Sequence, residues 1–155
     1  MNIELTINGD ATTTEVGAGE TLLELLRRLG YTSVKDGCAH GDCGTCAVLL
    51  DGRAATACLL FAAQADGREV TTIEGLATNG HGLPEAMLDV GAVQCGFCIP
   101  AMILTAADLL RREETPTRDE IATYLAGNLC RCTGYVKQLD AVELAIARAE
   151  ELAAG

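Results

Sequence analysis

Residues 37–46 of the chain read GCAHGDCGTC and place Cys38, Cys43 and Cys46 within nine residues. A fourth cysteine, Cys58, follows on the return strand of an expected hairpin and completes a C-x4-C-x2-C-x11-C spacing. The three glycines of the loop permit backbone conformations that other residues resist. Such a loop can fold tightly around an inorganic group and direct its N–H groups at sulfur. The pattern therefore predicts a site in which four thiolates bind an inorganic group.

The sequence on both sides of this loop predicts a small β-rich unit. Apolar and polar residues alternate as in half-buried strands, and the expected strands are 3–7, 11–16, 46–50, 53–59 and 70–73. Turn signals at Asn8-Gly9-Asp10 and Asp51-Gly52 indicate hairpins. A helix fits residues 22–29, because Thr21 and Glu24 form a capping box at its start.

The second half of the chain has a helical pattern. Residues 75–82 are rich in turn formers and are expected to be a linker. Pro84 and Pro100 can each occupy the first turn of a helix, and Thr117 with Glu120 makes a second capping box. The expected helices run from 84 to about 90, from 100 to 112, from 118 to 126 and onward from about 138. We therefore predict an α+β chain with one unit at residues 1–78 and a small helical bundle at 79–155.

The helical half contains a second set of four cysteines. Cys95, Cys98, Cys130 and Cys132 are spaced C-x2-C-x31-C-x-C. Two expected helices separate the pairs and can bring them together as an antiparallel hairpin. Both pairs lie at helix ends, where backbone groups without helical partners are available.

Three chemistries are compatible with two sets of four cysteines. The spacing of the first set is that of plant-type [2Fe–2S] proteins. Two structural zinc sites would also use all eight residues, although zinc sites usually combine repeated short pairs. Disulfides are disfavoured, because no secretion signal is present at the start of the sequence and cysteines in a reducing compartment more often bind metal. His40 and His81 are expected to be loop residues, since both sets are complete without them.

Composition excludes several function classes. The 155 residues include 22 acidic and 11 basic side chains, which gives a formal net charge of −11. This balance argues against nucleic-acid binding, which requires a clustered basic surface. No apolar run approaches the roughly 20 residues of a membrane span, so we expect no membrane segment. Because the start of the sequence also lacks the pattern of a secretion signal, we expect a cytoplasmic protein. Hydrophobic residues make up 49% of the chain, which is enough for a packed core.

Three segments carry a resemblance to a known family. GDCGTC at 41–46, QCGFC at 94–98 and GNLCRCTGY at 127–135 are similar to the small iron–sulfur subunit of the molybdenum hydroxylases. This family includes xanthine dehydrogenase, aldehyde oxidoreductase and carbon monoxide dehydrogenase. The resemblance covers nearly the whole chain, and the second set of cysteines is its more specific part. Ile99 and Ala101 depart from the threonine and glycine that most members have.

The resemblance implies a plant-ferredoxin-like β-grasp followed by a C-terminal four-helix bundle, each with one [2Fe–2S] cluster. The metal ligands would be Cys38, Cys43, Cys46, Cys58, Cys95, Cys98, Cys130 and Cys132. Electrons would leave a molybdenum–pterin centre in a large subunit, cross the two clusters and reach FAD in a medium subunit. Gln94 aligns with a residue that hydrogen-bonds the pterin in this family. From the residue alone, an amide that bonds to a nearby turn is an equal alternative.

The expected function is therefore one-electron relay within a molybdenum-dependent oxidoreductase, without substrate chemistry in this chain. Two alternatives remain open from the sequence. One is a free-standing soluble ferredoxin that diffuses between enzymes. The other is a binding module that is stabilised by zinc.

Overall fold

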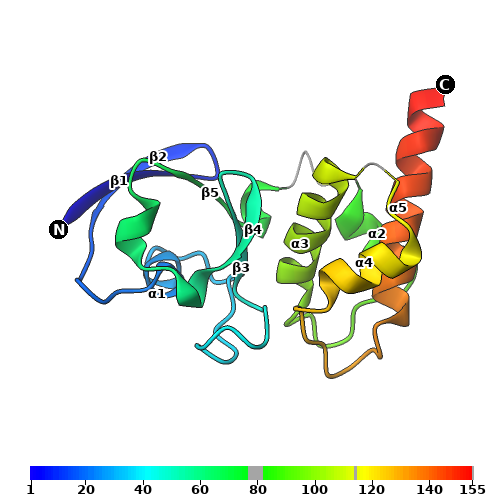
Figure 1. Cartoon of the computed structure of the whole chain (residues 1–155), viewed down its shortest axis with the longest axis horizontal. Helices are drawn as coiled ribbons and strands as arrows, with labels where there is room; N and C mark the ends of the chain where they lie inside the picture. Colours follow the sequence, from blue (N-terminus) through cyan, green and yellow to red (C-terminus); the bar gives the residue numbers. More distant parts are fainter. Residues whose placement is uncertain (77–81, 114, 155) are drawn as a thin grey trace.

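A computed structural model of the chain describes residues 1–76, 82–113 and 115–154. The first half contains strands β1 (Asn2–Ile7), β2 (Asp10–Glu15), β3 (Ala47–Leu50), β4 (Arg53–Thr56) and β5 (Glu69–Thr71), with helix α1 (Leu22–Arg28). The second half contains α2 (Leu83–Asp89), α3 (Ile99–Arg112), α4 (Arg118–Leu125) and α5 (Val136–Ala154). The predicted α+β organisation, with the strands in the first half and four helices in the second, is confirmed (Figure 1).

The five strands form one mixed sheet in the order β2-β1-β5-β3-β4. β1 pairs in parallel with β5, and the other neighbours are antiparallel. Both predicted hairpin turns are present, because Asn8-Gly9 and Asp51-Gly52 all adopt positive φ as a primed two-residue turn requires. β4 ends at Thr56, earlier than predicted, and residues 57–59 form a short 3-10 turn.

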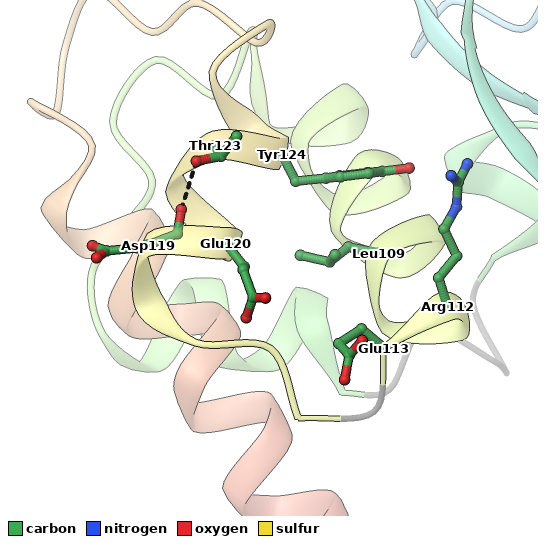
Figure 2. A pocket seen from close by; sticks show the side chains of 7 residues that line it. All are labelled: Leu109, Arg112, Glu113, Asp119, Glu120, Thr123 and Tyr124. Carbon is green, nitrogen blue, oxygen red and sulfur yellow. Dashed lines mark hydrogen bonds between the residues drawn. The ribbon is translucent and has the colours of Figure 1, made fainter.

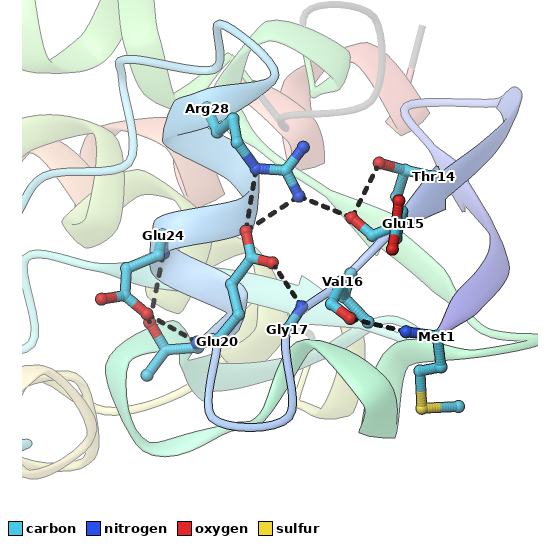
Figure 3. Close-up of polar contacts among 9 residues, drawn as sticks. Met1, Thr14, Glu15, Val16, Gly17, Glu20, Glu24 and Arg28 are labelled. Carbon is cyan, nitrogen blue, oxygen red and sulfur yellow. Dashed lines mark hydrogen bonds and ion pairs between the residues drawn. The ribbon is translucent and has the colours of Figure 1, made fainter.

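Helix α1 covers one face of this sheet, and polar contacts fix its start. Thr21 and Glu24 form the predicted capping box. Figure 3 shows how the preceding loop is closed: Glu20 accepts hydrogen bonds from the Arg28 side chain and from the Gly17 N–H at 3.1 Å. Arg28 also donates to the Glu15 carbonyl at 2.9 Å. These contacts join the end of β2 to the helix that covers the sheet.

Strand β3 links the two halves. All four of its residues are buried, because Val48 and Leu50 pack into the core beneath α1 whereas Leu49 belongs to the core of the helical half. Helix α3 packs against β3 and β4, on the face of the sheet that Leu49 occupies, and Figure 1 shows α3 next to these two strands. A strand that is apolar on both faces is expected where both faces of a sheet are covered.

The helical half is built around α3, which is buried over most of its length. Helix α4 begins with the predicted Thr117–Glu120 capping box. α5 starts at Val136, two residues before the predicted start, and its far end carries the C-terminus away from the sheet (Figure 1). No helix among the described residues is both long and apolar enough to cross a membrane.

Candidate iron–sulfur sites

The first four cysteines lie in the first half of the chain, in the two segments that flank the β3–β4 hairpin. Cys38 and Cys43 lie in the loop between α1 and β3, and Cys46 directly precedes β3. Cys58 lies in the 3-10 turn after β4, not on the strand itself as predicted. The reason is that the Ala57 N–H bonds the Cys46 carbonyl at 3.2 Å, after which the chain turns away from β3. Cys58 nevertheless stays beside Cys46.

The second four cysteines gather at one end of the helical half. Cys95 follows α2, Cys98 is the N-cap of α3, and Cys130 and Cys132 lie in the loop between α4 and α5. Helices α3 and α4, which separate the two pairs in the sequence, pack against each other, and the ends of these helices bring the pairs together. All eight cysteines are free thiols in the structure.

Within each set the thiols associate in pairs. The Sγ atoms of Cys95 and Cys132 are 3.5 Å apart. Burial and the neighbouring Cys130 raise the pKa of Cys98, and the pKa values of Cys46 and Cys38 are likewise shifted in part by Cys58 and Cys43, so these thiols are also neighbours. A tetrahedral metal that binds two thiolates at about 2.3 Å holds their sulfurs about 3.8 Å apart. The Cys95–Cys132 pair is close to that separation before any metal is bound.

The pairs fit a two-iron cluster. A [2Fe–2S] cluster takes four cysteines, two for each iron, so paired thiols meet its requirement. Within residues 1–76, 82–113 and 115–154, no three or more Cys, His, Asp or Glu side chains converge as a single metal ion would require. In the loop of the first set, Gly37 leaves room for the sulfurs because it has no side chain. A Cβ at this position would lie only 2.9 Å from the Sγ of Cys43.

Backbone and hydroxyl groups surround the sulfurs. Hydrogen bonds from the backbone of His40 and of Cys43 lower the pKa of Cys38 to about 6. The Cys43 N–H donates to the Sγ of Cys38, with 3.4 Å between nitrogen and sulfur. Hydroxyls are present at both sites, with Thr45 Oγ1 3.1 Å from the sulfur of Cys43. Because the thiolate is the form that binds metal, such donors stabilise the ligand and the cluster.

Burial distinguishes the pairs. Desolvation raises the pKa of Cys46 and of Cys98 to about 12, because both thiols lie in apolar surroundings. Cys95 and Cys132 are exposed. The second site therefore has an inner pair next to the helical core and an outer pair at the surface.

Gln94 lies beside that outer pair. Its side chain is exposed, and its Nε2 donates to the Cys132 carbonyl at 3.1 Å. This contact corresponds to the alternative in which the amide bonds to a nearby turn. His40 is an exposed loop residue as predicted, with its Nε2 2.9 Å from Asp42, while His81 lies outside the described residues.

The two thiol-bearing loops touch each other, which the sequence did not indicate. The Leu129 N–H donates to the Cys43 carbonyl at 2.9 Å, and the buried Asn128 donates from Nδ2 to the Gly44 carbonyl at 3.1 Å. Leu129 directly precedes Cys130, so one backbone hydrogen bond joins a cysteine of the first set to the neighbour of a cysteine of the second. No pattern in the 127–135 segment indicates this contact, because the burial of Asn128 follows only from the packing of the two halves.

A separate hollow lies at the other end of α3 from Cys98. It has a volume of about 430 Å³ and lies between α3 and α4 (Figure 2). Its lining includes Arg112, Glu113, Asp119 and Glu120 but no cysteine. The hollow is therefore not part of either sulfur site.

Comparisons with known proteins agree with this geometry. A family model described as "2Fe-2S iron-sulfur cluster binding domain" matches residues 5–77, and one described as "[2Fe-2S] binding domain" matches residues 72–143. Fold and site thus define an iron–sulfur protein of the [2Fe–2S] class with two binding domains.

Individual relatives narrow the class. The nicotinate dehydrogenase small FeS subunit of Eubacterium barkeri is 46% identical over 151 residues, which is 96% of each chain. The xanthine dehydrogenase iron-sulfur-binding subunit of Escherichia coli O157:H7 is 48% identical over 139 residues and 87% of each chain. The chain belongs to the family of small iron–sulfur subunits of the molybdenum hydroxylases.

Solved structures support the same assignment. A chain of quinoline 2-oxidoreductase from Pseudomonas putida 86 superposes with a TM-score of 0.91 at 39% identity, over 98% of this chain and 96% of that one. Aldehyde oxidoreductase from Desulfovibrio gigas has the same TM-score and identity over 98% of this chain, but only 17% of its own. The chain therefore has the electron-transfer role of an iron–sulfur subunit in an oxidoreductase.

Proposed function

We propose that this chain relays single electrons between a molybdenum–pterin centre in a large subunit and FAD in a medium subunit. Two [2Fe–2S] clusters would carry the electrons, one held by Cys38, Cys43, Cys46 and Cys58 and the other by Cys95, Cys98, Cys130 and Cys132. The observation that carries the proposal is the contact between the two thiol-bearing loops. It gives an electron a short route through the polypeptide from one site to the other.

In this relay the cysteines, the groups that surround their sulfurs and the apolar cores have separate tasks. The thiolates hold iron in pairs, and backbone N–H groups and the Thr45 hydroxyl stabilise the sulfurs. The apolar cores beside Cys46 and Cys98 exclude water from the inner pairs. The clusters supply one-electron redox chemistry when bound, and the protein sets their position and potential.

The exposed pair Cys95–Cys132 marks the face that we propose for the large subunit. Apolar side chains are exposed around it, at Phe97, Leu129 and Val136. Apolar exposure next to a functional group is typical of an interaction site. The names of the relatives, a small FeS subunit and an iron-sulfur-binding subunit, also describe chains that act beside others. We further propose a boundary between the two domains at 78/79, within the undescribed segment, and a cytoplasmic location.

Single cysteine variants test the ligand assignment. Cys43→Ser is expected to perturb one reduced-cluster EPR signal and Cys98→Ser the other, because each removes a ligand from a different site. Loss of the same signal in both variants, with the other signal intact, would contradict two independent sites.

Isolation of the native chain separates the proposal from its alternatives. We expect brown, iron-containing protein that co-purifies with a molybdenum-containing subunit. A monomer that contains iron but has no such partner would favour a free-standing ferredoxin. Colourless protein that contains zinc and no iron would favour the binding module.

Gln94 is proposed to hydrogen-bond the pterin from the outer face of the second site. Gln94→Ala is then expected to slow reduction of the clusters by substrate in the native complex, while both EPR signals keep their shape. Gln64→Ala makes the same change in the other half and should leave that rate unchanged. Equal rates in both variants would leave Gln94 with only its contact to Cys132.

A further inference from the structure

Gln138 is a polar side chain buried in the helical core. It lies in the first turn of α5 and is 1% exposed, on the same face as the buried residues Ala141, Val142 and Ala145. Burial of an amide is unfavourable unless its hydrogen bonds are satisfied. The hydrogen-bond partners of the Gln138 carboxamide therefore explain why a glutamine is tolerated at this position.

The orientation of this carboxamide follows from its neighbours. Nε2 lies 3.3 Å from the carbonyl oxygen of Ala92. A carbonyl can only accept, so the nitrogen and not the oxygen must face it. One N–H is thereby used, and the second N–H remains for another acceptor. The Sγ atom of Cys130 lies 3.7 Å from the same nitrogen.

Thr133 completes a small network around that sulfur. Its Oγ1 lies 3.1 Å from the Cys130 sulfur and 2.9 Å from Oε1 of Gln138. A ligating thiolate carries no proton and can only accept. If the hydroxyl donates to Gln138 Oε1, the free N–H of Gln138 is directed at the sulfur. If Gln138 donates to the hydroxyl oxygen, the hydroxyl proton is directed at the sulfur instead.

We propose that Gln138 is a positioning residue that keeps a hydrogen-bond donor on the Cys130 sulfur and so raises the reduction potential of the second cluster. The inference rests on the proposed ligation of that cluster. Reduction adds negative charge to the cluster and its thiolates, so a donor to sulfur stabilises the reduced form more than the oxidised one. The buried setting strengthens the effect, because water does not compete for the sulfur.

Redox titration of the native complex, followed by EPR of each reduced cluster, tests the proposal. Gln138→Met keeps the length and apolar packing of the side chain but removes both N–H donors, and with them the contact that orients the Thr133 hydroxyl toward the sulfur. We expect the ratio of reduced to oxidised second cluster to fall about tenfold at a fixed potential, which is about 59 mV for a one-electron couple. The potential of the first cluster should not change.

A matched control separates tuning from a general loss of packing. Thr105→Val also removes a buried hydrogen bond, but Thr105 Oγ1 donates at 2.9 Å to Ala101 of its own helix and not to a sulfur. Both potentials should stay at their original values in this variant. An unchanged second-cluster potential in Gln138→Met, or an equal shift in Thr105→Val, would overturn the proposal.

Failure to assemble the second cluster would also bear on the proposal. If Gln138→Met fails to assemble the second cluster, Gln138→Glu is used, since it replaces the N–H donors by an acceptor and should also lower the potential. Loss of the cluster in both variants, with the chain folded, would leave Gln138 a purely structural role and contradict the proposal. Absence of a second cluster in the unmodified chain would instead contradict the proposed function.

Discussion

At the scale of single residues, Asp108 is the clearest example of a buried charge with full compensation. It lies on α3 and is 1% exposed. Its carboxylate accepts from Arg112, from the Tyr124 hydroxyl at 2.8 Å and from the Ala54 N–H at 2.7 Å. Because Ala54 belongs to β4, this carboxylate ties the helical half to the sheet. Burial raises the pKa of Asp108, but the hydrogen bonds from Arg112, Ala54 and Tyr124 outweigh it and lower the pKa below the usual value.

Replacement of Asp108 by asparagine is expected to destabilise the chain and to weaken the acid sensitivity of folding. A group with a depressed folded-state pKa contributes its full stability above its unfolded value of about 3.9 and loses it as pH falls through the folded value. At pH 7 we expect a loss of about 2 kcal/mol in the free energy of unfolding, less than for a fully buried pair because the Arg112 side chain is 38% exposed.

Urea unfolding at pH 7 and below pH 4 provides the measurement. The difference between the original chain and Asp108→Asn should shrink as the pH falls. A difference that stays constant over this range would show that the carboxylate charge does not contribute.

At the scale of elements, the contact between the two thiol-bearing loops depends on Gly44. Its φ is +67°, and a Cβ at this position would lie 2.2 Å from the Gly127 carbonyl oxygen. Gly67 has nearly the same φ, +70°, but open space around it. Alanine substitutions at the two positions therefore distinguish the cost of backbone strain from the cost of steric contact between the loops.

Gly67→Ala should cost about 1 kcal/mol in the free energy of unfolding, the penalty for an L-residue in the left-handed region. Gly44→Ala has the same strain and must also push the loops apart. We expect it to cost more and to weaken the magnetic interaction between the two reduced clusters in EPR. Equal stability losses with an unchanged interaction would mean that the loop contact does not set the distance between the sites.

Local signals in the sequence predicted most elements. Both capping boxes, at Thr21 and Thr117, and both primed turns are where the sequence indicated. The parallel pairing of β1 with β5 was not predicted, because it joins residues more than 60 positions apart and leaves no local pattern. The premature end of β4 at Thr56 has a similar cause, since β4 stops where its partner β3 begins, at Ala47.

The candidate sites were predicted as sets of residues but not as environments. Spacing predicted all eight cysteines as ligands, and the structure brings the members of each set near one another, which is compatible with that prediction. The groups that surround the sulfurs come from elsewhere: Asn128 reaches the first loop from the second half, and Gln138 reaches Cys130 from α5. In the sequence Gln138 was only the expected start of a helix, and its burial depends on how α5 packs.

At the scale of the whole molecule, the chain is two small units with a shared strand. Leu49 of β3 enters the helical core while its neighbours stay in the first core. The thiol-bearing loops meet on one side of this junction, through the Leu129–Cys43 and Asn128–Gly44 hydrogen bonds. An arrangement that fixes both sites relative to each other suits a relay better than two independent binding modules.

Iron analysis combined with EPR spin counting on anaerobically prepared native protein tests this account most directly. Two [2Fe–2S] clusters require four iron atoms in each chain, and full reduction should give two distinct signals of equal intensity. Two iron atoms and a single signal, or zinc in place of iron, would contradict it.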